Sequence, residues 1–183
     1  MANQIWEPTS PMNTPMLWIN NYLSDKITSL TDLDKFPFFP STPSTINDLT
    51  QYFSRSTQGV AATWDRLIRM RRSPFPHIKQ EQALYYFYAQ GDNPTEIMVQ
   101  IQESVLRLMD RGDETAEDIN KWAKGKTFDG MTCKFYFHNF KIYQLEEARD
   151  IVDFGTARTY AGNKIIIDYD YHAMQEIIDS VNA

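Results

Sequence analysis

The chain has 183 residues, a formal net charge of −6 at pH 7 and 42% hydrophobic residues, which is typical of one globular domain with a proper core. The negative charge argues against broad, nonspecific binding to duplex nucleic acid, because phosphate neutralisation requires clustered Lys and Arg. The single cysteine, Cys133, excludes an intramolecular disulfide framework and a multi-thiolate metal site.

The amino-terminal residues 1–13 contain Pro8 and Pro11 without clear periodicity, and we expect them to form an extended tail. They lack the basic and apolar regions of a secretion signal, and no window of the chain holds the ~18 apolar residues needed to span a bilayer. We therefore expect a protein of cytoplasmic origin, in which residues 14–183 form a single domain.

Two segments in the amino-terminal third have helical spacing. Thr14 and Pro15 predict the start of a helix, with Thr as the N-cap and Pro at the first helical position. A stripe of apolar residues continues to about residue 30, and this helix should pack one face on a sheet. Residues 44–53 predict a second, shorter helix.

Residues 36–43 read Phe-Pro-Phe-Phe-Pro-Ser-Thr-Pro. This segment cannot continue a helix or form a central strand, because its three prolines remove backbone donors and fix φ. We expect its phenylalanines to fold back on their own domain; the alternative is that they fill a pocket of a neighbouring protein.

The middle of the chain contains two predicted strands. Residues 64–70 are interpreted as a strand that leads into a basic segment with prolines, although their Arg and Leu residues also allow a helix. Residues 83–89 are aromatic and are followed by Gly91, which is typical of a central strand.

The strongest helix prediction begins at Asn93 and Pro94, which supply an N-cap and a proline at the first helical position, followed by a glutamate at the third. Its apolar face continues until Gly112 ends the helix. Residues 113–126 then predict a short exposed helix with one aromatic anchor, Trp122.

Two further strands are predicted at residues 131–143 and 164–172, separated by a long charged arm at 144–162. We therefore expect an α+β fold: a small, mainly antiparallel sheet flanked by two or three helices, in a single domain with an extended amino-terminal segment. A long polar insert between strands is uncommon and usually marks a binding arm or disorder. We expect a neighbouring subunit to order this arm, so that deletion from Glu146 to Arg158 spares the fold.

The alternation in these strands assigns their side chains to faces. In the first strand, Cys133, Phe135 and Phe137 are predicted on one face, and Tyr136, His138 and Phe140 on the other. In the second, Ile165, Ile167, Tyr169 and Tyr171 share a face opposed by Ile166, Asp168, Asp170 and His172.

Asp168, Asp170 and His172 lie at alternate positions of the last strand and could in principle hold a divalent ion. The favoured alternative is the solvent face of an edge strand, where charge prevents sheet-to-sheet aggregation. None of the three histidines lies in a strand-turn-helix nucleophile elbow, and the sequence around Lys126 lacks the spacing of a phosphate loop. We therefore expect no enzyme, no catalytic residues, no metal and no cofactor.

A basic group is interleaved with Trp64 and Phe75 and comprises Arg66, Arg69, Arg71, Arg72 and Lys79. Its side chains could form a solvated strand face, an interface with an acidic neighbour, or a binding site for single-stranded nucleic acid, and the first two readings are favoured. The predicted arm contains acidic residues, whose charge is opposite to that of the arginines: Glu146, Glu147, Asp150 and Asp153. If copies of the chain met head to tail, arm and basic group would be complementary, which is how heterologous contacts close rings.

The order of predicted elements from about residue 64 to residue 172 can be compared with that of known protein families. It runs through Ser73-Pro74-Phe75-Pro76-His77-Ile78, a strand at 84–88, an acidic turn at 91–93, a helix at 96–111, a strand at 134–140, a charged excursion with Arg149, Asp150 and Arg158, and a closing strand at 164–171. In this order the chain resembles the tail terminator, or neck, proteins of contractile-tailed bacteriophages. Residues 1–60 lie outside the resemblance.

The resemblance implies a structural virion protein that is assembled in the host cytoplasm as a hexameric ring, caps the tail tube and joins it to the head connector or sheath. It implies no catalysis and no membrane, and nucleic acid only as DNA passing through the lumen of the ring. The alternative is a small nucleic-acid-binding protein that uses the arginines and Trp64. The subunit interface predicted with the resemblance comprises Arg66, Arg69, Arg71, Arg72, Glu146, Glu147, Arg149, Asp150, Asp153 and Arg158.

Overall fold

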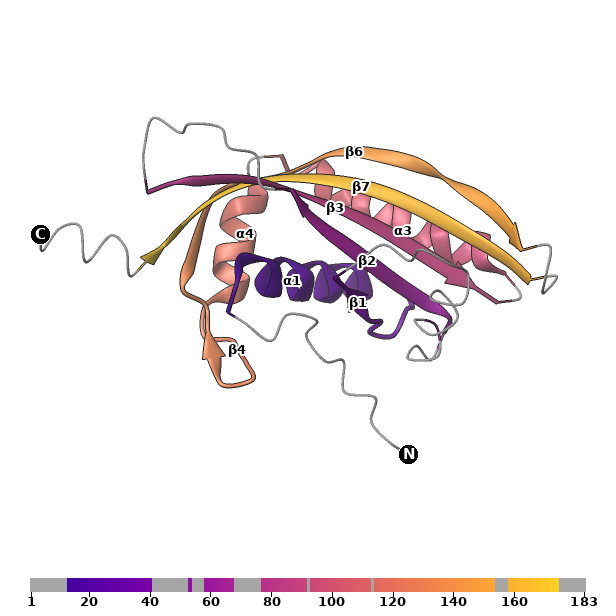
Figure 1. The fold of residues 1–183 in the computed structure, drawn as a ribbon, viewed down its shortest axis with the longest axis horizontal. Helices are drawn as coiled ribbons and strands as arrows, with labels where there is room; N and C mark the ends of the chain where they lie inside the picture. Colours follow the sequence, from indigo (N-terminus) through magenta and orange to yellow (C-terminus); the bar gives the residue numbers. More distant parts are fainter. Residues whose placement is uncertain are drawn as a thin grey trace, which may run out of the picture.

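The computed structural model describes residues 13–40, 53, 58–67, 77–91, 93–112, 114–153 and 158–174, with the backbone alone for 67, 144–153 and 158–161. In this part of the chain, three helices pack on a five-stranded sheet, and a two-stranded sheet lies at one end (Figure 1). The predicted α+β fold, with a mainly antiparallel sheet flanked by helices, is confirmed. Most of the predicted tail at 1–13 and of the predicted helix at 44–53 lies outside the described residues.

The helices begin close to the positions that the sequence predicts. α1 (Pro15–Leu30) follows Thr14, whose backbone is extended, and has its proline at the helix start. α3 (Pro94–Met109) follows Asn93 and likewise has its proline at the helix start, and α4 is Glu114–Ala123. Among the described residues, no helix is long and apolar enough to cross a membrane.

The five-stranded sheet has the order β1-β2-β3-β7-β6. Its strands are β1 (Phe38–Phe39), β2 (Val60–Leu67), β3 (Lys79–Gln90), β6 (Phe135–Asp153) and β7 (Arg158–Ala173). β1 runs parallel to β2, and every other neighbouring pair is antiparallel. β3 is the central strand, as predicted for residues 83–89, and residues 64–67 form a strand rather than a helix. The small sheet pairs β4 (Thr127–Phe128) with β5 (Met131–Thr132).

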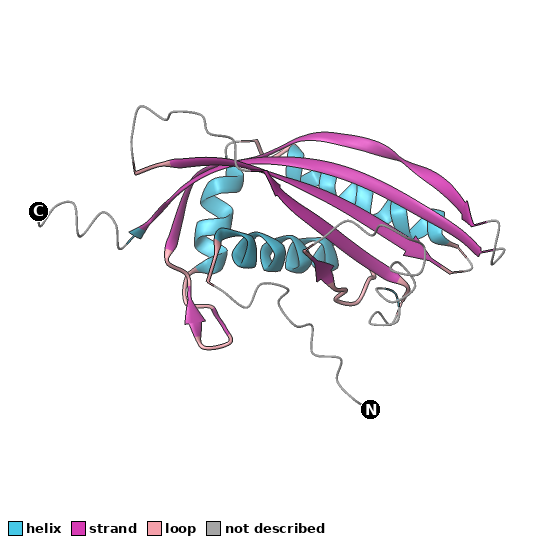
Figure 2. Ribbon diagram, in the orientation of Figure 1, coloured by secondary structure: helices cyan, strands magenta, loops and turns pink. Residues whose placement is uncertain are grey.

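The core lies between the helices and one face of the sheet, which curves over them (Figure 2). The predicted shared face of the last strand is confirmed and is buried, because its four side chains are at most 3% exposed. These four are Ile165, Ile167, Tyr169 and Tyr171. The facing side chains of α1 and α3 include Trp18, Tyr22, Met98, Ile101 and Val105.

Phe36 and Phe38 fold back on their own domain, as expected. Both are at most 1% exposed, and their rings stack with centroids 5.3 Å apart. Phe38 also packs edge-on against Tyr85 of the central strand, with centroids 6.1 Å apart. β1 therefore closes one edge of the sheet, and its Phe38 together with the preceding Phe36 contributes two aromatic rings to the core.

Residues 144–153 and 158–162 of the predicted arm are part of the sheet rather than a loop. Their backbone continues both β6 and β7, with Asp153 paired to Arg158, and β7 pairs in turn with β3 as far as Tyr160. Charged side chains do not prevent this, because the strands are joined through backbone groups. Deletion from Glu146 to Arg158 would therefore remove pairs of β6 with β7.

Three irregularities interrupt the pairing of β6 with β7, after Phe137, Ile142 and Glu146. At the first, one extra residue between Phe137 and Asn139 shifts the alternation. Phe140 is therefore buried on the same side as Phe137, each being 1% exposed. The predicted placement of Phe140 on the opposite face is wrong, because period-two alternation assumes a strand without bulges.

Candidate functional site

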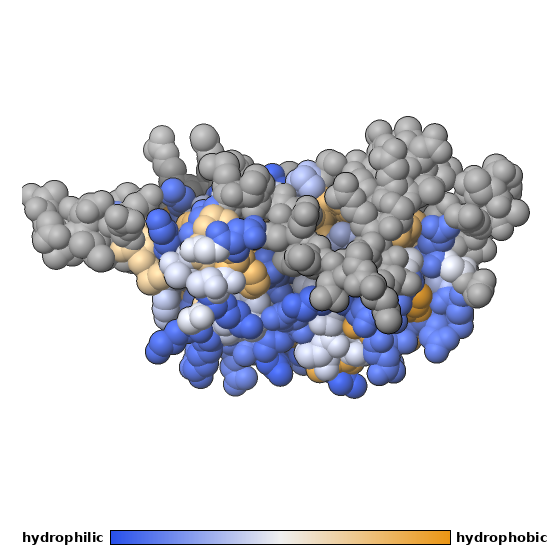
Figure 3. Space-filling model, turned by 90° about the horizontal axis from the view of Figure 1, so that it is seen from below, coloured by the Kyte–Doolittle hydropathy of each residue, from blue (hydrophilic) through white to orange (hydrophobic). Residues whose placement is uncertain are grey.

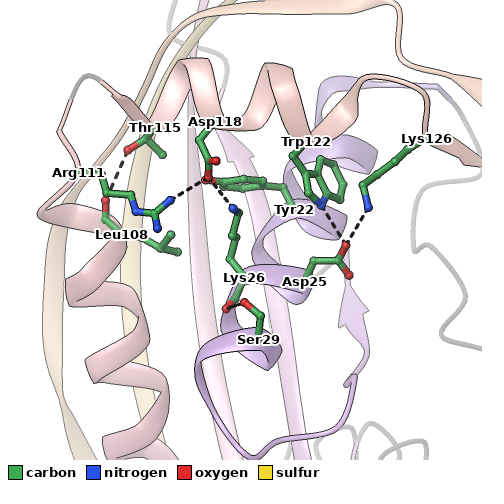
Figure 4. A network of polar contacts seen from close by, with 10 residues as sticks. All are labelled: Tyr22, Asp25, Lys26, Ser29, Leu108, Arg111, Thr115, Asp118, Trp122 and Lys126. Atoms are coloured by element: carbon green, nitrogen blue, oxygen red, sulfur yellow. Dashed lines mark hydrogen bonds and ion pairs between the residues drawn. The ribbon is translucent and has the colours of Figure 1, made fainter.

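α4 is fastened to α1 through Asp118 (Figure 4). Its Oδ2 accepts a hydrogen bond from Tyr22 at 2.8 Å and pairs with Lys26 at 2.7 Å and Arg111 at 3.2 Å. Burial opposes ionisation of this carboxyl, but the hydrogen bonds and positive charges outweigh it and hold the pKa of Asp118 below its usual value. Charge therefore fixes α4 in addition to apolar packing.

A second carboxylate, Asp25 of α1, holds the carboxyl end of α4. Its Oδ2 accepts a hydrogen bond from Trp122 Nε1 at 3.0 Å and lies 3.4 Å from Lys126 Nζ, as Figure 4 shows. The prediction of an exposed helix with one aromatic anchor underestimated the packing of α4. Besides the half-buried Trp122, it buries Thr115, Ala116, Ile119 and Ala123.

On its other side, α4 contacts the edge strand β6. The Nδ2 of Asn120 donates to the carbonyl oxygen of Phe137 at 2.8 Å, and its Oδ1 accepts from the Phe137 N–H at 2.9 Å. The amide thus satisfies backbone groups at the edge of the sheet, where no further strand is described. α4 and the first part of β6 are held in a fixed relation.

A groove of about 570 Å³ lies beside these two elements, bordered by the β4–β5 hairpin and the end of β7. Its surface is largely apolar, and hydrophobic residues are visible near this end of the molecule in Figure 3. Tyr136 and Met174 line it while remaining 46% and 43% exposed. The other lining residues include Ala123, Cys133, Phe135 and three lysines, Lys121, Lys124 and Lys126.

Tyr136 also contacts a pair of histidines from neighbouring strands. His172 on β7 lies directly opposite Tyr136, and His138 is the extra residue of the first bulge in β6. The Nε2 of His138 lies 2.5 Å from the Nδ1 of His172. The centroids of the two imidazoles lie 5.2 and 5.6 Å from that of Tyr136. The bulge therefore brings together three aromatic side chains beside the groove.

Glu81 forms a buried charged network on the core face of the sheet. Its side chain is 5% exposed and accepts two hydrogen bonds from Arg66, at 2.7 and 2.6 Å, with one each from Tyr169 and Tyr171. Burial opposes its ionisation, but these hydrogen bonds outweigh burial and hold the pKa of Glu81 below its usual value. Both carboxylate oxygens of Glu81 accept hydrogen bonds, and these bonds stabilise its ionised form.

The residues predicted to form a subunit interface fall into three groups. Arg66 is paired with Glu81 of its own chain, and the partly buried Trp64 packs against the core. Arg69, Arg71 and Arg72 lie outside the described residues. The backbones of Glu146, Glu147, Arg149, Asp150, Asp153 and Arg158 lie in β6 and β7.

Asp168, Asp170 and His172 share one face of β7, but they do not gather around a common point. Asp168 accepts a hydrogen bond from Gln82 at 2.8 Å, and Asp170 accepts one from Gln80 at 3.5 Å. Within the described ranges, no group of three or more His, Cys, Asp or Glu residues is arranged to hold a metal ion. The two aspartates belong to a hydrogen-bonded sheet face.

Sequence reasoning missed several residues of this end of the molecule. Glu81 offered a signal, because it shares strand parity with Ala83 and Tyr85, and a carboxylate on a buried face requires partners. The sequence offered no signal for the contacts of Asn120 or for the pairing of His138 with a second imidazole, since both depend on strand register.

Comparison of the sequence with protein-family models and with curated proteins finds no match.

Proposed function

We propose that this protein is a structural assembly component: a tail terminator or neck protein of a contractile-tailed bacteriophage, which caps the tail tube and joins it to the head connector or sheath. The resemblance in element order supports this role. A surface suited to another protein chain supports it independently.

The observation that carries the proposal is the groove beside α4 and β6. Exposed apolar surface in a concavity is unfavourable in water, and a partner that covers it removes this cost. Tyr136 and Met174 are of residue types enriched at interfaces, and both remain more than two-fifths exposed.

The free edge of β6 adjoins the groove. This strand is 19 residues long, which corresponds to roughly 60 Å, and no described strand pairs with its outer edge. Beyond the capped Phe137, its backbone could pair with an extended segment of another chain. This edge beside an apolar groove supports a contact with another chain at this end of the molecule.

The charge of the groove favours another copy of the chain as one of the partners. Three lysines and one carboxylate, Glu117, line it, whereas the whole chain carries a net charge of −6. An acidic face of a neighbouring copy would therefore meet an excess of positive charge at this surface. We propose a hexamer that contacts tail-tube, sheath or head-connector proteins through its other faces.

Particle assembly tests the proposal. Tyr136→Asp places a charge in the groove, and Leu106→Asp on α3 is the matched control, because Leu106 is 47% exposed and lies outside the groove. Electron microscopy of particles made with Tyr136→Asp should show unjoined heads and tails, whereas Leu106→Asp should give intact particles. Normal joining with Tyr136→Asp, or in the absence of the protein, would overturn the proposal.

A further inference from the structure

We infer that His138 and His172 form a binding site for a divalent transition-metal ion of the class that prefers imidazole, such as Zn²⁺, Ni²⁺ or Cu²⁺. Imidazole nitrogen is a common ligand for these ions. Here two imidazole nitrogens from neighbouring strands, His138 Nε2 and His172 Nδ1, face each other at 2.5 Å. This inference goes beyond the proposed function and does not depend on it.

The two nitrogens are close to the separation that a metal requires. Zinc binds imidazole nitrogen at about 2.0–2.1 Å, so two nitrogens in a tetrahedral site lie about 3.4 Å apart. The pair therefore has to open by about 0.9 Å to admit the ion. His138 is exposed and can make this adjustment by side-chain rotation, while His172, only 9% exposed, stays in place.

The local backbone explains why the two rings meet. In regular pairing, the residue opposite His172 is Tyr136, and the bulge after Phe137 supplies His138 as an additional residue. Bulges commonly redirect a side chain in this way beside functional sites. The Tyr136 ring contacts both imidazoles.

The site has two protein ligands in the described part of the chain, so its remaining coordination positions are open to water or to a group from a partner. Such a site binds more weakly than a structural zinc site with four protein ligands. Because Tyr136 also lines the groove, a partner seated there would approach the ion.

Isothermal titration of the full chain with ZnCl₂ tests the inference. The chain has only three histidines, so His77→Gln is a matched control, and Cys133→Ser excludes binding through the one thiol. We expect one Zn²⁺ per chain, with affinity reduced at least tenfold by either His138→Gln or His172→Gln. His77→Gln and Cys133→Ser should keep the affinity of the unsubstituted chain.

Imidazole ¹⁵N spectra supply a second readout that does not depend on substitution. Zn²⁺ should shift the signals of His138 Nε2 and His172 Nδ1 and leave those of His77 unchanged. Circular dichroism without metal verifies that each variant is folded. Absence of heat up to millimolar Zn²⁺, undiminished affinity of a folded His138→Gln or His172→Gln variant, or a dominant shift at His77 would overturn the inference.

Discussion

Asn120 on α4 makes two hydrogen bonds to the backbone of Phe137 on β6, one through its amide nitrogen and one through its amide oxygen. A side-chain amide has the same donor and acceptor as a peptide group, so Asn120 acts as a one-residue strand partner at the sheet edge. This contact joins the walls of the groove and protects the first part of β6 from pairing with other chains.

Replacement of Asn120 by Leu should therefore destabilise the protein by about 1–3 kcal/mol, because the N–H and C=O of Phe137 lose their partners. Urea unfolding followed by circular dichroism measures this loss. Lys124→Ala, one turn further along and exposed, is the control and should change stability by less than about 0.5 kcal/mol. Equal stabilities of the two variants would show that Asn120 does not hold the edge.

Glu81→Gln should cost about 3–5 kcal/mol, because it leaves the guanidinium of Arg66 half-buried without its counter-charge. The exposed Glu103→Gln on α3 is the control. The pKa of Glu81 lies below its ordinary value of 4.5. Ionised Glu81 therefore stabilises the fold at pH values above this ordinary pKa. The stabilisation disappears as the pH falls through the lowered pKa of the folded state.

The acid side of the stability profile should consequently be flatter in Glu81→Gln than in the unsubstituted chain. Urea unfolding at a series of pH values between neutral and strongly acid gives both profiles. Parallel profiles would contradict the assignment of a stabilising charge to Glu81.

Asp118→Asn should destabilise the packing of α4 on α1 by about 1–2 kcal/mol, since three donors converge on one carboxylate oxygen. The neighbouring Glu117 pairs with Lys121 at the surface, with side chains 68% and 73% exposed, so Glu117→Gln should cost less than about 0.5 kcal/mol. Thermal unfolding of both variants makes the comparison. A larger loss for Glu117→Gln would show that the network of Asp118 is not what fixes α4.

Gly59→Ala should destabilise strongly, because a Cβ there would lie 2.3 Å from the carbonyl oxygen of Gln90, and φ is +68°. Gly130→Ala separates the two causes, since its φ is +76° but no heavy atom lies within 4 Å of the added Cβ. We expect Gly59→Ala to cost at least about 2 kcal/mol more than Gly130→Ala in urea unfolding. Similar losses of stability in the two variants would mean that the backbone around Gly59 moves to make room for the added Cβ.

Local signals in the sequence predicted much of the fold. Pro15 and Pro94 located two helix starts, and the alternation from Ile165 to Tyr171 predicted the buried face of β7. These features depend on neighbouring residues and on burial of one face, which a sequence displays directly.

The features that failed depend on pairing between distant segments. Phe140 changed face because of a bulge, and the predicted arm pairs within the sheet at residues 144–153 and 158–162 although it is rich in charged residues. The same dependence explains why the contacts of Asn120 and His138 were missed, since each partner is set by strand register. Periodicity contains no information about register across a hairpin.

Native mass spectrometry of the full chain tests most directly the claim that this end of the sheet is an assembly surface. We predict a closed oligomer, with the hexamer as its expected form, for the unsubstituted chain and for Leu106→Asp, and monomer for folded Tyr136→Asp. A monomer of the unsubstituted chain at micromolar concentration, or an oligomer that Tyr136→Asp leaves intact, would contradict the account.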